Sequence, residues 1–148
     1  MIKNILVTTL LLASSISADL IRDDNLDVVN DDTAYLMWQD NSDVRLLAKN
    51  WQDAIDYCAD LTHANYTNWR LPNFNELYSI VDKDASDPAI NSSFVNVASD
   101  MFSPNIYWSS TSYSLYTTQA WTIIFSDANN GKISKTNSNY VRCVRDNH

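Results

Sequence analysis

The two cysteines, Cys58 and Cys143, constrain the fold of this 148-residue chain more than any other feature of its sequence. In an exported protein two cysteines most often pair, because the periplasm and the extracellular space are oxidising. The disulfide would close a loop of about 86 residues and contribute roughly 4 to 5 kcal/mol in the chain-entropy model. A metal site or a reactive thiol pair has little support, since the two histidines, His63 and His148, complete no ligand set with metal-site spacing. We therefore predict one disulfide and no metal site.

The N-terminal segment has the features of a secretory signal peptide. Lys3 provides a basic start, Ile5–Leu12 an apolar stretch, and the small residues up to Ala18 a cleavage site. A membrane-spanning helix needs about 20 apolar residues, and the serines before Asp19 interrupt the run earlier. The sequence therefore predicts a signal peptide over residues 1–18, cleaved near residue 17 or 18. We expect a periplasmic or secreted protein without membrane insertion.

Residues 19–148 have the length of one domain with one core. Loss of residues 1–18 removes one lysine and no acidic residue, so the formal net charge changes from −8 to −9. This charge disfavours nucleic acid and anionic membranes as partners. The sequence leaves open a local basic cluster near the C-terminus, formed by Lys132, Lys135, Arg142 and Arg145.

The first half of the domain contains signals for a hairpin and a helix. Strand-like runs at Leu26–Asn30 and Ala34–Trp38 flank a polar turn. Asn50 is a good N-cap for a helix from Trp51 to about Thr62, whose apolar residues recur at helical spacing. The first cysteine falls on this apolar stripe, so it is expected to face inward.

A second helix and a long loop follow. The residues before Pro72 should be extended, because a proline pushes its predecessor out of the α region. Asn73 and Glu76 have capping-box spacing, which predicts a helix that ends near Asp82. The polar segment over residues 83–105 is predicted to be a mostly irregular loop, and loops of that length are often functional.

Strand patterns dominate the last third of the chain. They predict strands at Tyr107–Thr111, Trp121–Phe125 and Tyr140–Arg145. Asn130-Gly131 is a turn signal, with a short return strand expected over residues 132–134. The face of the last strand that carries the second cysteine should pack on the first helix. The predicted class is α+β, with two helices packed on a small, mainly antiparallel sheet, long loops and one disulfide.

A series of short motifs resembles the bacterial Lcl C-terminal domain family, named for the end domain of a collagen-like adhesin. In order along the chain they are Leu36-Met37-Trp38-Gln39, Trp51, Ala54, Tyr57-Cys58, Leu61, Trp69-Arg70-Leu71-Pro72-Asn73, Glu76-Leu77, Tyr107-Trp108-Ser109-Ser110-Thr111, Ala120-Trp121, Phe125 and Val141-Arg142-Cys143-Val144-Arg145. Together they cover nearly all of residues 19–148. The chain departs from the family at Tyr35, where a glycine is usual, and it has no collagen-like region.

The resemblance implies a C-type-lectin-like fold related to that of formylglycine-generating enzymes, with a helix near the start tied by a disulfide to the final strand. It also implies a glycan ligand and further copies of the chain as partners, and we expect the partner to be either a glycan or a surface protein of the envelope or of a host. The named adhesin domain is thought to trimerise and to bind sulfated glycans through a basic surface, whereas this chain is strongly acidic.

Aromatic residues are the first candidates for a binding site, because Trp and Tyr are enriched at recognition surfaces. Tyr113 and Tyr116 stand in a polar segment between two predicted strands, and we predict that this loop binds ligand together with Lys132 and Lys135. The motif positions of the remaining candidates favour structural roles: Trp51, Trp69, Arg70, Glu76, Trp108 and Trp121.

Catalytic and metal-binding alternatives are weaker. Glu76 is the only glutamate, and a capping role or an ion pair with Arg70 fits it better than catalysis. Asp127 and Asn129 faintly resemble a calcium loop, but a hairpin turn is the better interpretation. We predict no cofactor and no enzymatic activity, since the cysteines are committed to the disulfide and no Ser/His/Asp set is in evidence.

The leading functional hypothesis is an extracytoplasmic recognition module that binds a glycan or another surface polymer. The alternative is a protein-interaction or assembly subunit of the cell envelope without a small ligand. A formylglycine-generating type of enzyme is the remote third.

Overall fold

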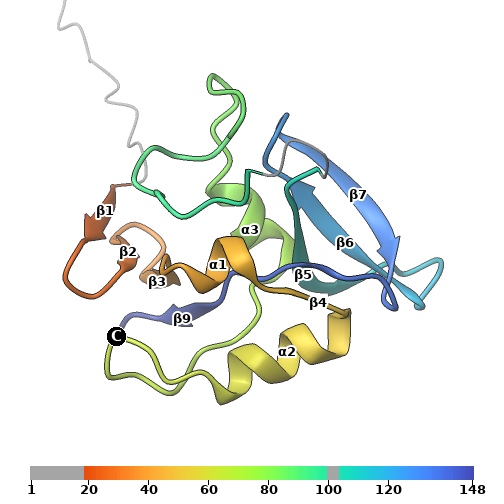
Figure 1. Ribbon diagram of the computed structural model, residues 1–148, viewed down its shortest axis with the longest axis horizontal. Coiled ribbons are helices and arrows are strands. Elements are labelled where there is room, and N and C mark those ends of the chain that lie inside the picture. Colours follow the sequence, from red (N-terminus) through yellow and green to blue (C-terminus); the bar gives the residue numbers. More distant parts are fainter. Residues whose placement is uncertain (1–18, 100–103) are drawn as a thin grey trace, which may run out of the picture.

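The fold is built on two sheets instead of the one small sheet expected (Figure 1). The computed structural model describes residues 19–99 and 104–148, so the predicted signal peptide over residues 1–18 lies outside the described part. The first sheet has the order β1-β2-β3-β9, and the second has the order β4-β8-β5-β6-β7. β5 pairs with β8 in parallel, and the other strand pairs of the described residues are antiparallel. The α+β class with mainly antiparallel pairing is therefore confirmed.

The strand bounds are as follows: β1 Leu20–Asp23, β2 Val28–Asp31, β3 Leu36–Gln39, β4 Ala48–Lys49, β5 Ile106–Ser112, β6 Gln119–Ile124, β7 Asn129–Ser134, β8 Asn139–Tyr140 and β9 Val144–Asp146. β2 and β3 form the predicted first hairpin, displaced by one or two residues from the expected bounds. β1, which pairs with β2, was not expected from the sequence.

Within the described residues three helices connect the strands, where two were expected: α1 (Asp43–Leu46), α2 (Trp51–Asp60) and α3 (Phe74–Ser79). α1 was not expected from the sequence. The Asn50 side chain accepts a hydrogen bond from the backbone N–H of Asp53, so the predicted N-cap of α2 is confirmed. None of the helices in the described ranges is long and apolar enough to cross a membrane.

The capping box that opens α3 is also confirmed. The side chain of Asn73 accepts from the backbone N–H of Glu76, and the Glu76 carboxylate accepts from the backbone N–H of Asn73. The helix ends at Ser79, earlier than the expected end near Asp82. The reason is a β-bridge between Val81 and Ile90, which requires extended backbone just after the helix.

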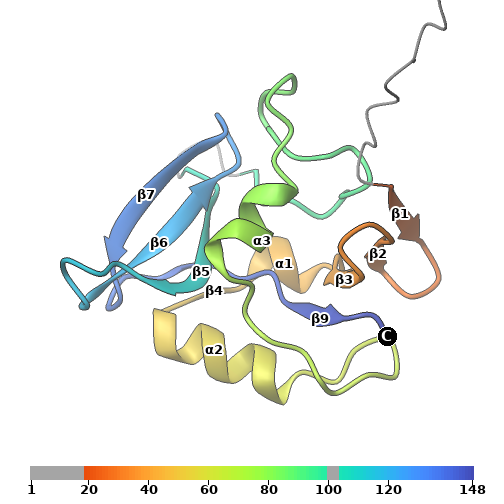
Figure 2. The ribbon, with the colours of Figure 1, turned by 180° about the vertical axis from the view of Figure 1, so that it is seen from behind.

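Buried apolar side chains form two clusters where one core was expected. Neighbouring strand residues point to opposite faces, so Trp38 and Tyr107 join the first cluster while Met37 and Trp108 join the second. The first cluster consists of Val29, Leu36, Trp38, Val44, Leu77, Ile80, Ile90, Phe94, Ala98, Tyr107, Ile123, Phe125 and Val144. The second consists of Val28, Met37, Ala54, Cys58, Trp69, Leu71, Trp108, Ala120, Val141 and Cys143. α3 contributes to the first cluster and α2 to the second, and the view from behind shows these helices well apart (Figure 2).

The predicted disulfide between Cys58 and Cys143 is present, with an S–S distance of 2.04 Å and a Cα–Cα distance of 5.5 Å. The single last strand predicted over Tyr140–Arg145 is wrong. The chain forms β8 in the second sheet, crosses over residues 141–143, and forms β9 in the first sheet. At the crossing, the backbone N–H of Gln39 donates to the carbonyl of Cys143 at 2.9 Å. The disulfide therefore ties α2 to the crossover that joins the two sheets.

The turn predicted at Asn130-Gly131 lies elsewhere. Both residues are inside β7, and the hairpin turn spans residues 125–128. The Asp127 carboxylate accepts a hydrogen bond from the backbone N–H of Asn129 at 3.1 Å, which is a turn-forming contact of aspartate. Glycine suits this strand position, because a Cβ atom on residue 131 would lie only 3.3 Å from the Thr122 hydroxyl oxygen on the neighbouring strand. The corrected register places Trp121 directly opposite Lys132.

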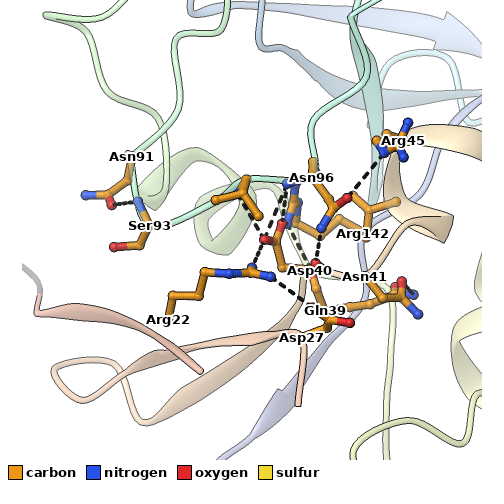
Figure 3. A network of polar contacts seen from close by, with 12 residues as sticks. Arg22, Asp27, Gln39, Asp40, Asn41, Arg45, Asn91, Ser93, Asn96 and Arg142 are labelled. Atoms are coloured by element: carbon orange, nitrogen blue, oxygen red, sulfur yellow. Dashed lines mark hydrogen bonds and ion pairs between the residues drawn. The ribbon is translucent and has the colours of Figure 1, made fainter. Parts of the chain in front are cut away.

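Asp40 anchors the predicted long loop to both ends of the domain (Figure 3). Residues 83–99 and 104–105 form no helix or strand of their own, apart from the single bridge at Ile90. The fully buried Asp40 carboxylate accepts hydrogen bonds from the backbone N–H groups of Val95 and Asn96, and it pairs with the guanidinium groups of Arg22 and Arg142. We call these four partners and Asp40 the Asp40 network. It fixes the loop against the first hairpin and the crossover.

Replacing Trp108 by alanine is expected to lower the free energy of unfolding by at least about 3 kcal/mol. Trp108 is fully buried, and its indole N–H donates to the carbonyl of Lys49 at 2.8 Å, so truncation leaves both a cavity and an unpaired carbonyl. Thermal and urea unfolding would measure the loss. Tyr116→Ala is the control, because this tyrosine is 64% exposed and its truncation should change stability by no more than about 0.5 kcal/mol. Equal stability of the two variants would contradict the assignment of Trp108 to the core.

Candidate functional site

Five aromatic rings follow one another across one side of the second sheet, and we call them the aromatic row. From the β5–β6 loop to α3 they are Tyr116, Tyr113, Trp121, Phe74 and Tyr78. The successive distances between ring centroids are 5.9, 5.6, 5.1 and 5.9 Å. Tyr116 is exposed and the other four are half-buried, so the row is partly open to solvent.

Local structure explains why these rings meet. Trp121 and the buried Ile123 share the face of β6 that packs against α3. Phe74 and Tyr78 are four residues apart on α3, so their rings lie on one side of the helix and stack with an interplanar angle of 14°. The β5–β6 loop is tight, because the backbone N–H of Tyr113 donates to the carbonyl of Gln119 at 2.9 Å. The loop therefore holds Tyr113 edge-on against Trp121.

Two lysines lie over the row. The ammonium nitrogen of Lys132 is 4.2 Å from the ring centroid of Trp121 and 5.2 Å from that of Tyr113. At the other end, the ammonium nitrogen of Lys83 is 5.2 Å from the ring centroid of Tyr78, and a hydrogen bond with the Tyr78 hydroxyl raises the pKa of Lys83. The row thus combines aromatic surface with exposed positive charge.

Of the four predicted ligand residues, the structure brings together Tyr113, Tyr116 and Lys132 but not Lys135. The ammonium nitrogen of Lys135 lies 3.7 Å from the ring centroid of Trp51 and donates to the Ser112 hydroxyl at 2.7 Å. Trp51 packs against the second cluster, with α2. Lys135 and Trp51 therefore form a separate pair outside the row.

The basic cluster that the sequence left open near the C-terminus does not form. Arg142 is fully buried beside Asp40, and Arg145 is only 5% exposed, with its guanidinium 3.9 Å from the ring centroid of Tyr66. Lys132 and Lys135 cover different tryptophans. The four basic residues are thus distributed between the interior and two separate aromatic contacts.

The four tryptophans grouped as structural have different environments. Trp69 and Trp108 are buried, whereas Trp51 and Trp121 are half-buried and carry a lysine on the ring. The motif position of Trp121 favoured packing alone, but its place in the middle of the row also leaves part of the ring accessible.

Arg70 and Glu76 form a two-pronged ion pair, with both N–O distances at 2.8 Å. Glu76 also completes the capping box of α3, so its oxygens already have partners. The Glu76 hydrogen bond raises the pKa of Arg70, and a second contact of this arginine lowers the pKa of Asp146. The Arg70–Glu76 pair joins the extended segment before α3 to that helix, and the contact of Arg70 with Asp146 joins the same segment to β9. The arrangement is structural.

A separate pocket of about 460 Å³ lies beside α2. Its lining includes Lys49, Tyr57 and three aspartates on the exposed surface of the helix: Asp53, Asp56 and Asp60. Burial raises the pKa of Tyr57 to about 12. The Tyr57 hydroxyl donates to the Asp43 carboxylate at 3.1 Å and accepts from the Gln39 amide at 3.0 Å. The Tyr57 hydroxyl therefore already has internal hydrogen-bond partners.

The Asp127 carboxylate makes hydrogen bonds within its own hairpin turn. Both carboxylate oxygens accept hydrogen bonds from Asn129, one from its backbone N–H and one from its side-chain amide. Over residues 19–99 and 104–148, no group of three or more His, Cys, Asp and Glu side chains is placed to hold a metal ion.

Three features of the structure were not predicted from the sequence. Phe74 and Tyr78 were not expected to extend the row, although their spacing of four residues within the second helix was a visible signal. The pairing of Lys132 with Trp121 would have followed from a turn placed at residues 125–128. The Asp40 network had no local signal, because the partners of Asp40 lie between 18 and 102 residues away from it along the chain.

Comparison with protein families gives a match over most of the chain. The family model described as the Lcl C-terminal domain matches residues 27–145 of the 148 residues. The matched range contains the disulfide, the Asp40 network except Arg22, and the whole aromatic row. A comparison with curated proteins found no match.

Proposed function

Because the chain belongs to the Lcl C-terminal domain family, we propose that it is an extracytoplasmic recognition domain that binds a glycan or another surface polymer through the aromatic row. The proposal includes the finer fold assignment, a C-type-lectin-like domain, since α2 is tied by the disulfide to the crossover before β9. It also includes export, which the formed disulfide supports because such bonds persist in oxidising compartments.

The aromatic row is the observation that carries this proposal. Sugar rings bind proteins by stacking their C–H faces on Trp and Tyr rings, and aromatic residues with a polar tip are common at recognition sites. Here five rings from three separate elements are adjacent and partly open, and no buried ligand pocket is required. A surface of this kind suits an extended polymer better than a small metabolite.

A binding role is favoured over catalysis. Formylglycine-generating chemistry depends on reactive cysteines, and both cysteines of this chain are in the disulfide. The acidic net charge supports partners other than nucleic acid.

A protein partner in the envelope is the second candidate, and one observation favours it. Leu115, at the tip of the β5–β6 loop, is 73% exposed beside Tyr116. An exposed leucine next to an aromatic ring suits a protein surface, because apolar side chains contribute to protein interfaces by burial. Pull-down from envelope extract beside a glycan array would separate the two functions.

We expect Tyr116→Ala to weaken binding to the glycans that score on the array while leaving the melting temperature nearly unchanged. Tyr116 is 64% exposed and contributes ring surface rather than core packing. Truncation of a tyrosine that is a binding hot spot costs more than about 1 kcal/mol, or more than about fivefold in affinity. Titration calorimetry and thermal melts on the same samples would measure both quantities.

Tyr35→Ala is the matched control, because Tyr35 is 67% exposed but lies in the first hairpin, far along the chain from the row. Tyr113→Ala should weaken binding too, with some loss of stability, since this ring packs edge-on against Trp121. Unchanged binding by both row variants would place the site elsewhere, with the loop over residues 83–105 as the next candidate.

A further inference from the structure

Lys132 covers the ring at the centre of the aromatic row. Its ammonium nitrogen lies 4.2 Å from the Trp121 ring centroid. Phe74 and Tyr113 approach the same ring at angles of 51° and 84°, so neither lies flat on it. Lys132 therefore lies over the Trp121 ring, whereas the rings of Phe74 and Tyr113 meet it at an angle.

The contact holding Lys132 is weak. Ion pairs between described residues involve Arg22, Arg70 and Arg142, and none involves a lysine. The described contacts of the Lys132 ammonium are the rings of Trp121 and Tyr113. A cation on an exposed ring corresponds to about a two- to fivefold change in an equilibrium constant. Lys132 is itself exposed, so a ligand could displace it.

Lys135, a second lysine over a tryptophan ring, is held by more contacts than Lys132. It lies over Trp51, but its ammonium also donates to the Ser112 hydroxyl at 2.7 Å. Its backbone N–H donates to Thr118, and its carbonyl accepts from the backbone N–H of Trp51. Lys135 is half-buried by these contacts. The pair Lys135 and Trp51 is therefore a matched reference for Lys132 and Trp121.

We propose that Lys132 is a displaceable cover on Trp121 that lowers the affinity of the aromatic row for neutral sugars. The inference rests on the proposed function, glycan binding by the row. A neutral pyranose stacks on the face of an indole ring, and here that face already holds an ammonium group. The sugar must displace the cation, and it brings no negative charge to compensate for the contact that is lost. Lys132 thus acts as an internal competitor that disfavours neutral sugars.

The test compares Lys132→Met, which keeps the aliphatic stem but removes the charge, with Lys132→Arg and Lys135→Met. The proton shifts of the Lys132 side chain in the free protein report whether it lies in the ring current of Trp121. Titration with the neutral tetramer of N-acetylglucosamine, followed at the Trp121 indole N–H by NMR, reports affinity. We expect ring-current shifts on Lys132 and about two- to fivefold tighter binding by Lys132→Met. Lys132→Arg and Lys135→Met should bind like the wild type.

Two results would overturn the inference. Absence of ring-current shifts on Lys132 would mean that the cover does not form, whatever binds to the row. With the cover present, equal or weaker tetramer binding by Lys132→Met would mean that Lys132 does not compete with neutral sugar, while the Tyr116→Ala experiment would still decide the proposed function. If no glycan on the array binds either form, the proposed function and the inference fail together.

Discussion

Asp40→Asn is expected to lower the free energy of unfolding by about 5 kcal/mol, at the upper end of the cost of breaking a buried ion pair. The Asp40 carboxylate has no exposed surface, and it is the partner of the equally buried Arg142 guanidinium at 2.7 Å. It also accepts hydrogen bonds from the backbone N–H groups of Val95 and Asn96. An asparagine amide in its place would leave the buried Arg142 guanidinium without its counter-ion. The amide N–H groups would also face the N–H donors that now bind the carboxylate. A loss of this size is comparable with the whole stability of many domains, about 5 to 15 kcal/mol.

Asp27→Asn provides the matched control. Asp27 pairs with Arg22 of the same network at 2.9 Å, but its side chain is 52% exposed. Exposed ion pairs contribute about 0 to 1 kcal/mol, so this variant should unfold almost like the wild type. Urea titrations of both variants, of Arg142→Met and of Asp40→Asn/Arg142→Met would measure the coupling between Asp40 and Arg142. The double variant should lose less free energy of unfolding than the sum of the losses of Asp40→Asn and Arg142→Met. Similar stabilities of Asp40→Asn and Asp27→Asn would contradict the structural role of the Asp40 network.

Removal of the disulfide by Cys58→Ala/Cys143→Ala is expected to cost about 4 kcal/mol, because the bond closes most of the chain into one loop and restricts the unfolded state. Both sulfur atoms lie in the fully buried second cluster, so the substitution also removes packing there. We expect a large decrease in the melting temperature and selective loosening of α2 and of the crossover over residues 141–143. Hydrogen exchange at the amides of α2 would measure this local effect.

Mass spectrometry of the non-reduced, periplasmically expressed protein is the companion measurement, and it should show no free thiol. The matched variant is Ala59→Ser on the exposed side of α2, which leaves the bond intact and should not change the exchange of the crossover amides. Two free thiols in folded, fully stable protein would contradict the proposed importance of the bond.

Local elements were predictable because their causes lie within a few residues. The N-cap at Asn50 and the capping box of Asn73 and Glu76 depend on side chains three residues apart. The disulfide was predictable from the cysteine count and from the expected export. The displaced turn before β7 shows the limit of such signals. Asn130-Gly131 is a turn-forming pair in isolation, but cross-strand pairing with Ile123 and Thr122 placed it inside a strand.

The candidate site was only half predictable from sequence. Tyr113 and Tyr116 were identified because a polar loop between strands is exposed. Their continuation through Trp121 to Phe74 depends on α3 packing on β6, although 39 residues of the chain lie between these two elements. Periodicity shows that a side chain faces inward or outward, but it does not show which other element lies opposite.

The caps of α2 and α3, the cysteine pair and the family follow from the amino-acid sequence. The division of the chain into two sheets at the crossover over residues 141–143, the contact of Asp40 with Arg142, and the adjacency of the rings of the row arise only in the folded protein. The cause is distance along the chain. Capping and periodicity act over three or four residues, whereas these contacts form only when the burial of both apolar clusters repays the entropy of closing long loops.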